Sequence, residues 1–202
     1  MWDDAPMTAR VLLLHGYQHM RPRAHWMWWL AEELRRRRVP VQYPQLPNPG
    51  DPVLEDWSAI AATEIDMTGA ADDERIVIAH SLGTVLWRHL ETVQGRPLAD
   101  RVLLVAPPGP EQLSRIGDFA SAAGAPDTPL AAATMLAREV DPYRREPLEA
   151  VAASWGVPGI VLPGTGHLNP DDGHGPWPAV LEWTMRGDAE WRLAEGARSL
   201  DA

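Results

Sequence analysis

The stretch RIVIAHSLG, residues 75–83, carries the strongest indication of the fold of this chain. Its apolar run over 75–80 predicts a buried strand, and a helix is expected to begin at Leu82. Ser81 lies between the two. A strand, a sharp turn at a serine and a helix are typical of a nucleophile elbow, which lifts the serine hydroxyl above the sheet edge. The alternative is that Ser81 only caps the helix.

Small residues flank Ser81 on both sides, as the tight turn of an elbow requires. The usual pattern has glycine two residues before and two residues after the serine, and this chain has Ala79 and Gly83 there. Alanine is the next smallest residue, so the departure is mild. The N-terminus of the following helix would place partial positive charge beside Ser81. The backbone N–H of Leu82 is therefore a candidate donor to an oxyanion.

Working outward from this stretch, apolar runs alternate with segments of helical character along the whole chain. The expected strands cover residues 11–15, 39–43, 75–80, 101–106, 132–137 and 159–162. The expected helices cover residues 24–38, 54–67, 82–93, 111–119, 146–155 and 177–185. This alternation predicts a single α/β domain over 1–202, with about six parallel strands in the order 2-1-3-4-5-6, helices on both faces and a minimal lid. Residues 187–202 are expected to form a loosely attached tail with Trp191 and Leu193 as anchors.

Composition narrows the classes of function. The chain has 202 residues, a net charge of −10 and no cysteine. The negative charge argues against nucleic acid as a partner. The lack of cysteine excludes disulfides, thiolate zinc sites and cysteine nucleophiles. Apolar runs fall short of the about 20 residues of a membrane helix, and the acidic first residues do not resemble a signal peptide. We expect a cytoplasmic protein without a cofactor; no feature indicates its oligomeric state.

A histidine-glycine pair, His15-Gly16, follows the first expected strand. Such a pair commonly opens the loop that supplies the second donor of an oxyanion hole. The N–H of Tyr17 is the candidate donor, and that of Gln18 is the alternate. The competing interpretation is an ordinary turn in which Gly16 adopts a positive φ.

A candidate base and its acid partner follow the last two expected strands. His167 lies in a glycine-rich loop after 159–162, and Asp141 lies at a Pro-marked turn after 132–137. An aspartate there would accept the Nδ1–H of His167 and stabilise the imidazolium. Asp141 is preferred over the rival acids because the order Ser…Asp…His, each at a strand end, is that of α/β-hydrolases. The rival acids are Glu139, Asp171 and Asp172, and Asp141 itself has the alternative role of a helix cap.

Other polar and aromatic residues admit two interpretations each. His167, Asp171, Asp172 and His174 lack a recognised metal-ligand pattern, so no metal is expected. Asn169 is expected to tie its loop by side-chain hydrogen bonds. Trp26 and Trp29 lie one helical turn apart and suit either core packing or an apolar acyl pocket. The candidate substrate-binding residues are Gln18, Trp26 and Asn169.

Across most of its length the chain resembles the small serine hydrolases typified by retinoblastoma-binding protein 9, in the α/β-hydrolase superfamily. The matching motifs are HW at 25–26, DW at 56–57, AHSLG at 79–83, LLVAPP at 103–108, DPY at 141–143, SWG at 154–156 and GHLNPDDGHGPWP at 166–178. The resemblance implies a sheet without the large lid of lipases, ester or peptide-type hydrolysis, and Ser81, Asp141 and His167 as the catalytic triad. The loop YQHMRPRA at 17–24 departs from the family pattern.

These observations together predict a carboxylesterase-like serine hydrolase. It would cleave small ester, thioester or peptide-type acyl bonds through an acyl-serine intermediate, with a small acyl compound as its partner. One alternative is a protein-binding module with little or no catalysis on a hydrolase scaffold, because fold does not imply function. Another is a transferase that passes the acyl group to a second alcohol. An open site is expected, with 109–130 along its border.

Overall fold

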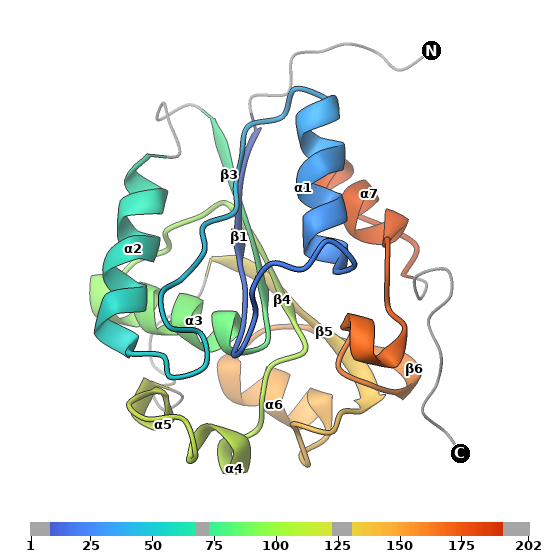
Figure 1. The fold of residues 1–202 in the computed structure, drawn as a ribbon. Helices are drawn as coiled ribbons and strands as arrows, with labels where there is room; N and C mark the ends of the chain where they lie inside the picture. The colour runs from blue at the N-terminus through green and yellow to red at the C-terminus, as the bar shows by residue number, and fades with distance from the viewer. Residues whose placement is uncertain (1–8, 68–72, 123–130, 192–202) are drawn as a thin grey trace.

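Six parallel strands form one sheet in the order β2-β1-β3-β4-β5-β6, as predicted (Figure 1). The computed structural model describes residues 9–67, 73–122 and 131–191. The strands are β1 (Ala9–Leu14), β2 (Val41–Gln42), β3 (Glu74–His80), β4 (Arg101–Val105), β5 (Ala132–Val140) and β6 (Gly159–Thr165).

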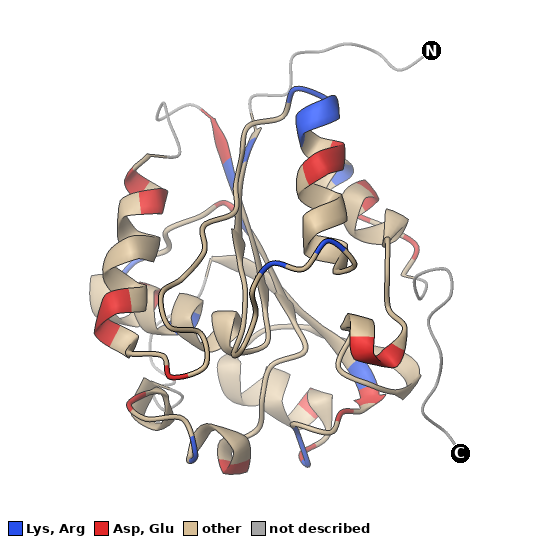
Figure 2. Cartoon of the chain, viewed as in Figure 1, with Lys and Arg blue, Asp and Glu red and all other residues tan. Residues whose placement is uncertain are grey.

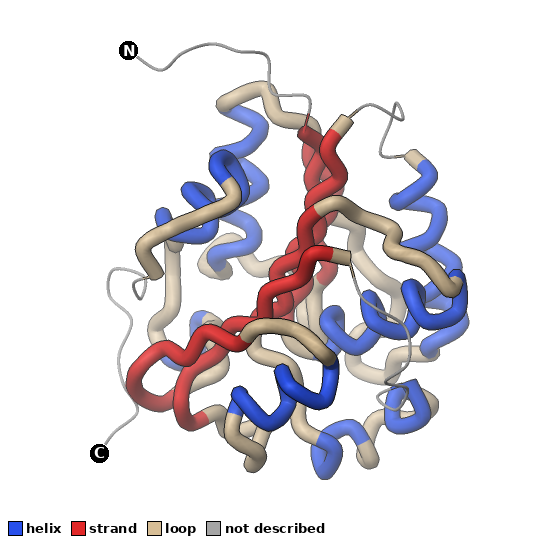
Figure 3. The backbone as a smooth tube through the Cα atoms, turned by 180° about the vertical axis from the view of Figure 1, so that it is seen from behind, coloured by secondary structure: helices blue, strands red, loops and turns tan. Residues whose placement is uncertain are grey.

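Helices cover both faces of this sheet. They are α1 (Trp26–Arg36), α2 (Leu54–Asp66), α3 (Leu82–Gln94), α4 (Pro110–Leu113), α5 (Phe119–Ala122), α6 (Leu148–Trp155), the 3-10 helix η1 (Pro170–Asp172) and α7 (Pro178–Arg186). Helices α1 and α7 pack together on one face, and α2 and α3 pack together on the other (Figures 1 and 3). Helix α6 packs on β5 and β6.

The core explains why the strands are almost continuously apolar. Side chains on both faces of the central strands are buried, such as Val11 and Ile76 on one face and Leu12 and Val77 on the other. A parallel sheet between two helix layers has no water-facing side, so alternation with polar residues is not needed. Charged residues of both signs lie mostly on helices and loops, and the middles of the strands are largely uncharged (Figure 2).

The strand order places the candidate nucleophile at a change of winding direction. Strand β1 has β2 on one side and β3 on the other, so the chain reverses its course across the sheet here. Leu14 is in register with Ala79, and His80 with Val105. The carboxyl ends of β1, β3 and β4 therefore meet around Ser81, at the edge where open α/β sheets bind ligands.

Three strands differ most from the prediction. Strand β6 continues to Thr165, beyond the predicted end at 162. Strand β2 covers only Val41–Gln42 instead of 39–43, because Pro40 and Pro44 have no N–H to donate to a ladder. Strand β5 continues to Val140, beyond the predicted end at 137, because it stays paired with β6 up to Thr165 after a register shift. This extension brings Asp141 directly to the end of β5.

The predicted helix over 111–119 is wrong. The chain forms α4 and α5 instead, and Gly117 between them has a φ of +39°. A residue with positive φ cannot continue a right-handed helix, so the segment turns there. The part of 109–130 from residue 123 onward lies outside the described residues.

The expected tail anchor Trp191 contacts Trp177, with ring centroids 6.1 Å apart. Leu193, with the rest of 192–202, lies outside the described residues. In the described ranges, no helix has both the length and the apolar character needed to cross a membrane.

Candidate active site

Ser81 stands on a strained turn between β3 and α3. Its backbone has φ 54° and ψ −125°, a region that costs a non-glycine residue about 1–3 kcal/mol and is concentrated at functional sites. The Ser81 N–H donates to the carbonyl of Val105 at 2.9 Å, which holds the turn against β4. The Ser81 side chain makes no capping hydrogen bond to α3. The alternative of a simple helix cap is therefore wrong.

The small residues around Ser81 are required by close backbone contacts. A Cβ atom at Gly83 would lie 2.5 Å from the carbonyl oxygen of Leu14 and 2.8 Å from that of His15. A Cβ atom at Gly16 would lie 2.6 Å from the Cβ of Ser81. The φ of Gly16 is not positive, so glycine is needed there for this close approach and not for a left-handed turn. The end of β1 and the start of α3 are in direct backbone contact.

His167 connects Ser81 to Asp141. Its Nε2 lies 2.9 Å from the Ser81 Oγ, and its Nδ1 lies 2.9 Å and 3.0 Å from the two carboxylate oxygens of Asp141. His167 and Asp141 are buried, at 5% and 4% exposure. Asp141 Oδ1 also accepts the N–H of Tyr143 at 2.9 Å, which fixes the carboxylate. The structure thus brings the three predicted catalytic side chains into one hydrogen-bonded series.

The three rival acids lie elsewhere. Glu139 is exposed, and Asp171 is exposed on the border of the cavity. Asp172 is buried and accepts the N–H groups of Leu168 and Asn169 at 3.0 and 3.1 Å. Its carboxylate is therefore used to hold the loop after His167.

Two buried rings fix the loop that carries His167, a role that was not predicted from the sequence. The Nε2–H of His80 donates to the carbonyl of His167 at 2.9 Å. The Nε1–H of Trp26 donates to the carbonyl of Leu168 at 2.9 Å. Leu168 has a φ of 54°, so its backbone is held in a conformation that needs such support. The position of His80 next to Ser81 was the one signal available in the sequence.

The two candidate oxyanion donors differ in what the structure says of them. Leu82 is the first residue of α3, so its N–H has no helical acceptor. The backbone nitrogen of Leu82 lies close to Gly16, 3.1 Å from the point that a Cβ atom at Gly16 would occupy. Tyr17 directly follows Gly16, and no hydrogen bond within the described ranges uses its N–H. The N–H of Gln18 donates to Pro49 at 2.6 Å, so it is already engaged. Gln18 is thereby ruled out as the alternate donor in this conformation.

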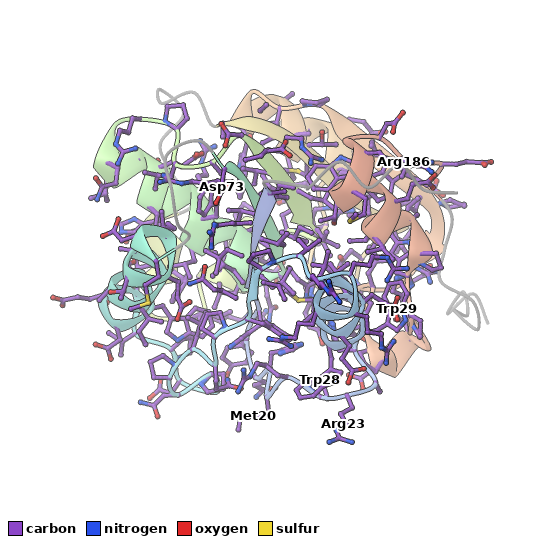
Figure 4. The ribbon with its side chains drawn as sticks, turned by 90° about the horizontal axis from the view of Figure 1, so that it is seen from above. Met20, Arg23, Trp28, Trp29, Asp73 and Arg186 are labelled. Atoms are coloured by element: carbon purple, nitrogen blue, oxygen red, sulfur yellow. The ribbon has the colours of Figure 1, made fainter. Side chains whose placement is uncertain are left out.

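A cavity of about 620 Å³ opens beside Ser81 and His167. Its border includes the apolar side chains of Tyr17, Met20 and Tyr143, which are 37%, 69% and 40% exposed. Met20 lies at the periphery of the molecule on the loop between β1 and α1 (Figure 4). Gln112 and Ile116 also line the cavity, so the segment that begins at residue 109 borders the pocket as predicted.

The predicted substrate-binding residues occupy different positions. Gln18 and Asn169 line the cavity. The Asn169 side chain also accepts the N–H groups of Asp171 and Asp172, so it ties its loop as expected. Trp26 does not line the cavity. It is fully buried with its ring edge-on to Trp177, because it is a core residue whose N–H supports the His167 loop.

The second tryptophan of the predicted pair, Trp29, is only partly buried. It and Trp28 lie on the sides of α1 that face away from the sheet (Figure 4). Trp28 lies near the guanidinium of Arg23, which is 5.8 Å from its ring centroid. Neither tryptophan is among the residues that line the cavity.

A continuous row of histidine rings leads away from His167 into the protein. The ring centroids are 5.0 Å apart for His167 and His80, 5.1 Å for His80 and His25, 4.5 Å for His25 and His19, and 5.1 Å for His19 and His15. This row was not predicted from the sequence, because its members come from three segments far apart in the chain.

Burial keeps the rings next to His167 uncharged. Loss of hydration lowers the pKa of His15 to about 4 and the pKa of His19 to about 3. The pKa values of His25 and His80 are well below their usual range, first because of burial and second because of neighbouring histidines. Burial also lowers the pKa of His174 to about 3. These imidazoles are therefore neutral at pH 7 and add no positive charge beside His167.

Within residues 9–67, 73–122 and 131–191, no group of three or more His, Asp or Glu residues is arranged to hold a metal ion. Of the cluster considered from the sequence, His174 is fully buried with its ring edge-on to Trp177, at 4.5 Å between centroids. Asp172 is engaged with backbone N–H groups. The cluster is therefore divided between separate structural roles.

The fold is that of α/β-hydrolases. The crystal structure of the ydeN gene product from Bacillus subtilis is similar, with a TM-score of 0.72 and 21% identity over 88% of this chain and 97% of that one. A monoacylglycerol lipase from Paleococcus ferrophilus has a TM-score of 0.62 and 15% identity over 89% of this chain and 95% of that one. Identities this low establish the shared fold alone.

Sequence comparison identifies the family. The model of the serine hydrolase family matches residues 11–185, and the chain belongs to this family. It is also 32% identical over 101 residues to YdeN of Bacillus subtilis (strain 168). That alignment covers 50% of this chain and 51% of YdeN, so it spans about half the length of this curated relative.

Proposed function

We propose that this chain is a cytoplasmic, carboxylesterase-type serine hydrolase that cleaves small ester, thioester or peptide-type acyl bonds through an acyl-serine intermediate. The observation that carries the proposal is the position of His167, 2.9 Å from both the Ser81 Oγ and an Asp141 carboxylate oxygen. Acyl transfer needs a buried carboxylate, an imidazole and a serine hydroxyl that are hydrogen-bonded in this order.

In the proposed reaction, Ser81 is the nucleophile, His167 transfers the protons and Asp141 supports His167. The Ser81 Oγ attacks the carbonyl carbon while His167 Nε2 accepts the hydroxyl proton. Asp141 accepts the Nδ1–H and stabilises the imidazolium. The N–H groups of Leu82 and Tyr17 donate to the oxyanion. His167 then protonates the leaving group as its bond to the acyl carbon breaks. In the second half His167 Nε2 takes a proton from the attacking water and returns it to the Ser81 Oγ as the acyl ester bond breaks and the free acid leaves.

The cavity supports uncharged acyl substrates of modest size. None of the described residues that line it is Lys or Arg, so it offers no cation to a carboxylate or phosphate. The apolar border at Tyr17, Met20 and Tyr143 suits an alkyl or aryl group beside the scissile bond. We also propose that the chain is related to the group typified by retinoblastoma-binding protein 9, and the motif at 166–178 is the main support for this relation.

A fluorophosphonate probe tests the proposal, with intact mass spectrometry as the readout. We expect stoichiometric labelling of the folded protein, loss of labelling in Ser81→Ala, and a fall in esterase kcat of about a million-fold in that variant. Ser154→Ala is the matched control, because Ser154 is exposed on α6 and its hydroxyl bonds only to the carbonyl of Val151.

The outcomes distinguish the alternatives. Labelling that persists in Ser81→Ala contradicts the assignment of the nucleophile. A folded protein that never labels favours the protein-binding module instead. Product analysis with an added alcohol separates a hydrolase, which forms the free acid, from a transferase, which forms a new ester.

A further inference from the structure

A second charged side chain lies behind Asp141 and takes no direct part in the hydrogen-bonded series. Arg144 Nη1 is 3.8 Å from the Asp141 Oδ2, and both side chains are fully buried, with 0% of their surface exposed. This distance is too long for a hydrogen bond. The two opposite charges nevertheless face each other where water cannot screen them.

The remaining donors of Arg144 hold the turn on which Asp141 lies. Arg144 Nη2 donates to the carbonyl of Arg138 at 2.8 Å, and Nε donates to the carbonyl of Glu146 at 2.9 Å. One acceptor precedes Asp141 and the other follows it. The backbone N–H of Arg144 also donates to the carbonyl of Asp141 at 3.1 Å. The guanidinium therefore ties together both ends of the turn between β5 and α6.

The ionisable groups around this pair belong to several elements. Asp141 faces His167, and the His167 ring faces Tyr143 at 4.6 Å and His80 at 5.0 Å. His25 lies behind His80.

Other charged groups lie on the Arg144 side. Arg138 is buried, and its positive charge adds to the lowering of the pKa of His174 that burial causes. Burial lowers the pKa of Arg144. The negative charges of Asp141, Glu146 and Glu149 oppose this lowering in part. Among the groups described here, Arg144 is the cation that faces the Asp141 carboxylate.

We propose that Arg144 is a positioning residue of the reaction: it holds the Asp141 turn in place, and its buried positive charge faces the carboxylate that pairs with His167. The inference rests on the proposed function, because it requires His167 as the base. A positive charge behind Asp141 favours the carboxylate and opposes the imidazolium. Removal of that charge makes the surroundings of His167 more negative, so His167 gains its proton at a higher pH.

The test is the pH profile of kcat/KM for a p-nitrophenyl ester, whose acidic limb reports the base of the free enzyme. We expect Arg144→Met to move this limb upward by about one pH unit. Arg144→Lys keeps the charge but loses the paired hydrogen bonds to Arg138 and Glu146. We expect it to retain the wild-type limb and to lower the plateau of kcat. Arg145→Met is the matched control, because the neighbouring Arg145 side chain is 82% exposed.

The results separate the two proposals. If the wild-type protein fails to label with a fluorophosphonate, the proposed function fails and Arg144 is not the cause. If the wild type labels and the folded Arg144→Met profile coincides with that of Arg145→Met, the role of Arg144 is overturned. If Arg144→Met does not fold, Arg144→Lys decides: a limb displaced by a full unit although the charge is kept overturns the electrostatic role.

Discussion

Acidification from pH 7 to pH 5 is expected to lower the free energy of unfolding of this protein by about 6 kcal/mol. The folded-state pKa is about 4 for His15 and about 3 for His19 and His174, against 6.5 for an ordinary histidine. A histidine whose pKa is lower in the folded than in the unfolded chain stabilises the fold at pH values above its unfolded pKa. That contribution is lost as the pH falls from 6.5 toward the folded value, because only the unfolded chain takes up the proton.

The magnitude follows from these pKa values. At pH 5 an unfolded histidine is almost fully protonated, whereas His15 in the fold is protonated in about one molecule in ten. Each of the three residues then costs about 2 kcal/mol, or about 6 kcal/mol in all. Domains are typically stable by about 5–15 kcal/mol, so a loss of this size ranges from about two fifths of the stability to all of it.

Urea unfolding followed by tryptophan fluorescence between pH 7.5 and pH 4.5 measures the effect. We expect the free energy of unfolding to fall with a limiting slope of at least about 4 kcal/mol per pH unit, since each of the three protons contributes about 1.4 and the lowered pKa values of His25 and His80 add to the slope. His174→Phe is expected to reduce the slope by one proton and to stabilise the protein at pH 5 by about 2 kcal/mol relative to the wild type. Neither ring nitrogen of His174 has a hydrogen-bond partner among the described residues, so phenylalanine loses no hydrogen bond.

His89→Gln is the control, because His89 lies on α3 outside the row of rings and is only partly buried. Its slope is expected to change less than that of His174→Phe. An unfolding free energy that stays level from pH 7 to pH 5 would refute the reasoning, since it would mean that these imidazoles accept protons in the folded state without cost.

Three further changes test the site. Gly83→Ala is expected to lose about 1–3 kcal/mol of unfolding free energy by urea denaturation, because the new Cβ would meet the last carbonyl of β1 at 2.5 Å, whereas Gly50→Ala, with nothing within 4 Å, is expected to be neutral. Trp26→Phe removes the donor to Leu168 and is expected to lower kcat about ten- to hundredfold with little change in KM; an unchanged kcat would contradict its positioning role. Tyr17→Pro removes the proposed oxyanion donor and is expected to lower kcat about 10²–10³-fold, while Tyr17→Phe, which keeps the N–H, is expected to lose far less.

The fold was predictable because local signals and topology agree. Apolar runs alternate with helical segments, and parallel strands bring their carboxyl ends to one edge, so residues at three strand ends had to lie near one another. That rule predicted that Ser81, Asp141 and His167 lie near one another, whereas the elbow motif identified Ser81 and the order Ser…Asp…His selected Asp141 among the rival acids. The bounds of β2 and the break at Gly117 were missed, because prolines next to a short strand and a glycine inside a helical pattern are weak signals.

The supporting residues could not be found in the same way. Trp26 reaches Leu168 across 142 positions of sequence, and His80 reaches His167 across 87. Such contacts depend on the packing of α1 and the loop after β6 against the same face, which no periodicity encodes. Arg144 is polar in a polar stretch, so the sequence favours an exposed side chain and the structure buries it.

The chemistry and the mouth of the cavity are built from different parts of the chain. The reacting groups stand on strand ends locked by glycine contacts and buried rings, whereas Met20 and Ile116 come from connecting segments at the border. Natural drift or a mutational library confined to those connecting segments could therefore retune what enters without disturbing turnover. The substrate range can therefore diverge on this scaffold while the catalytic residues keep their positions.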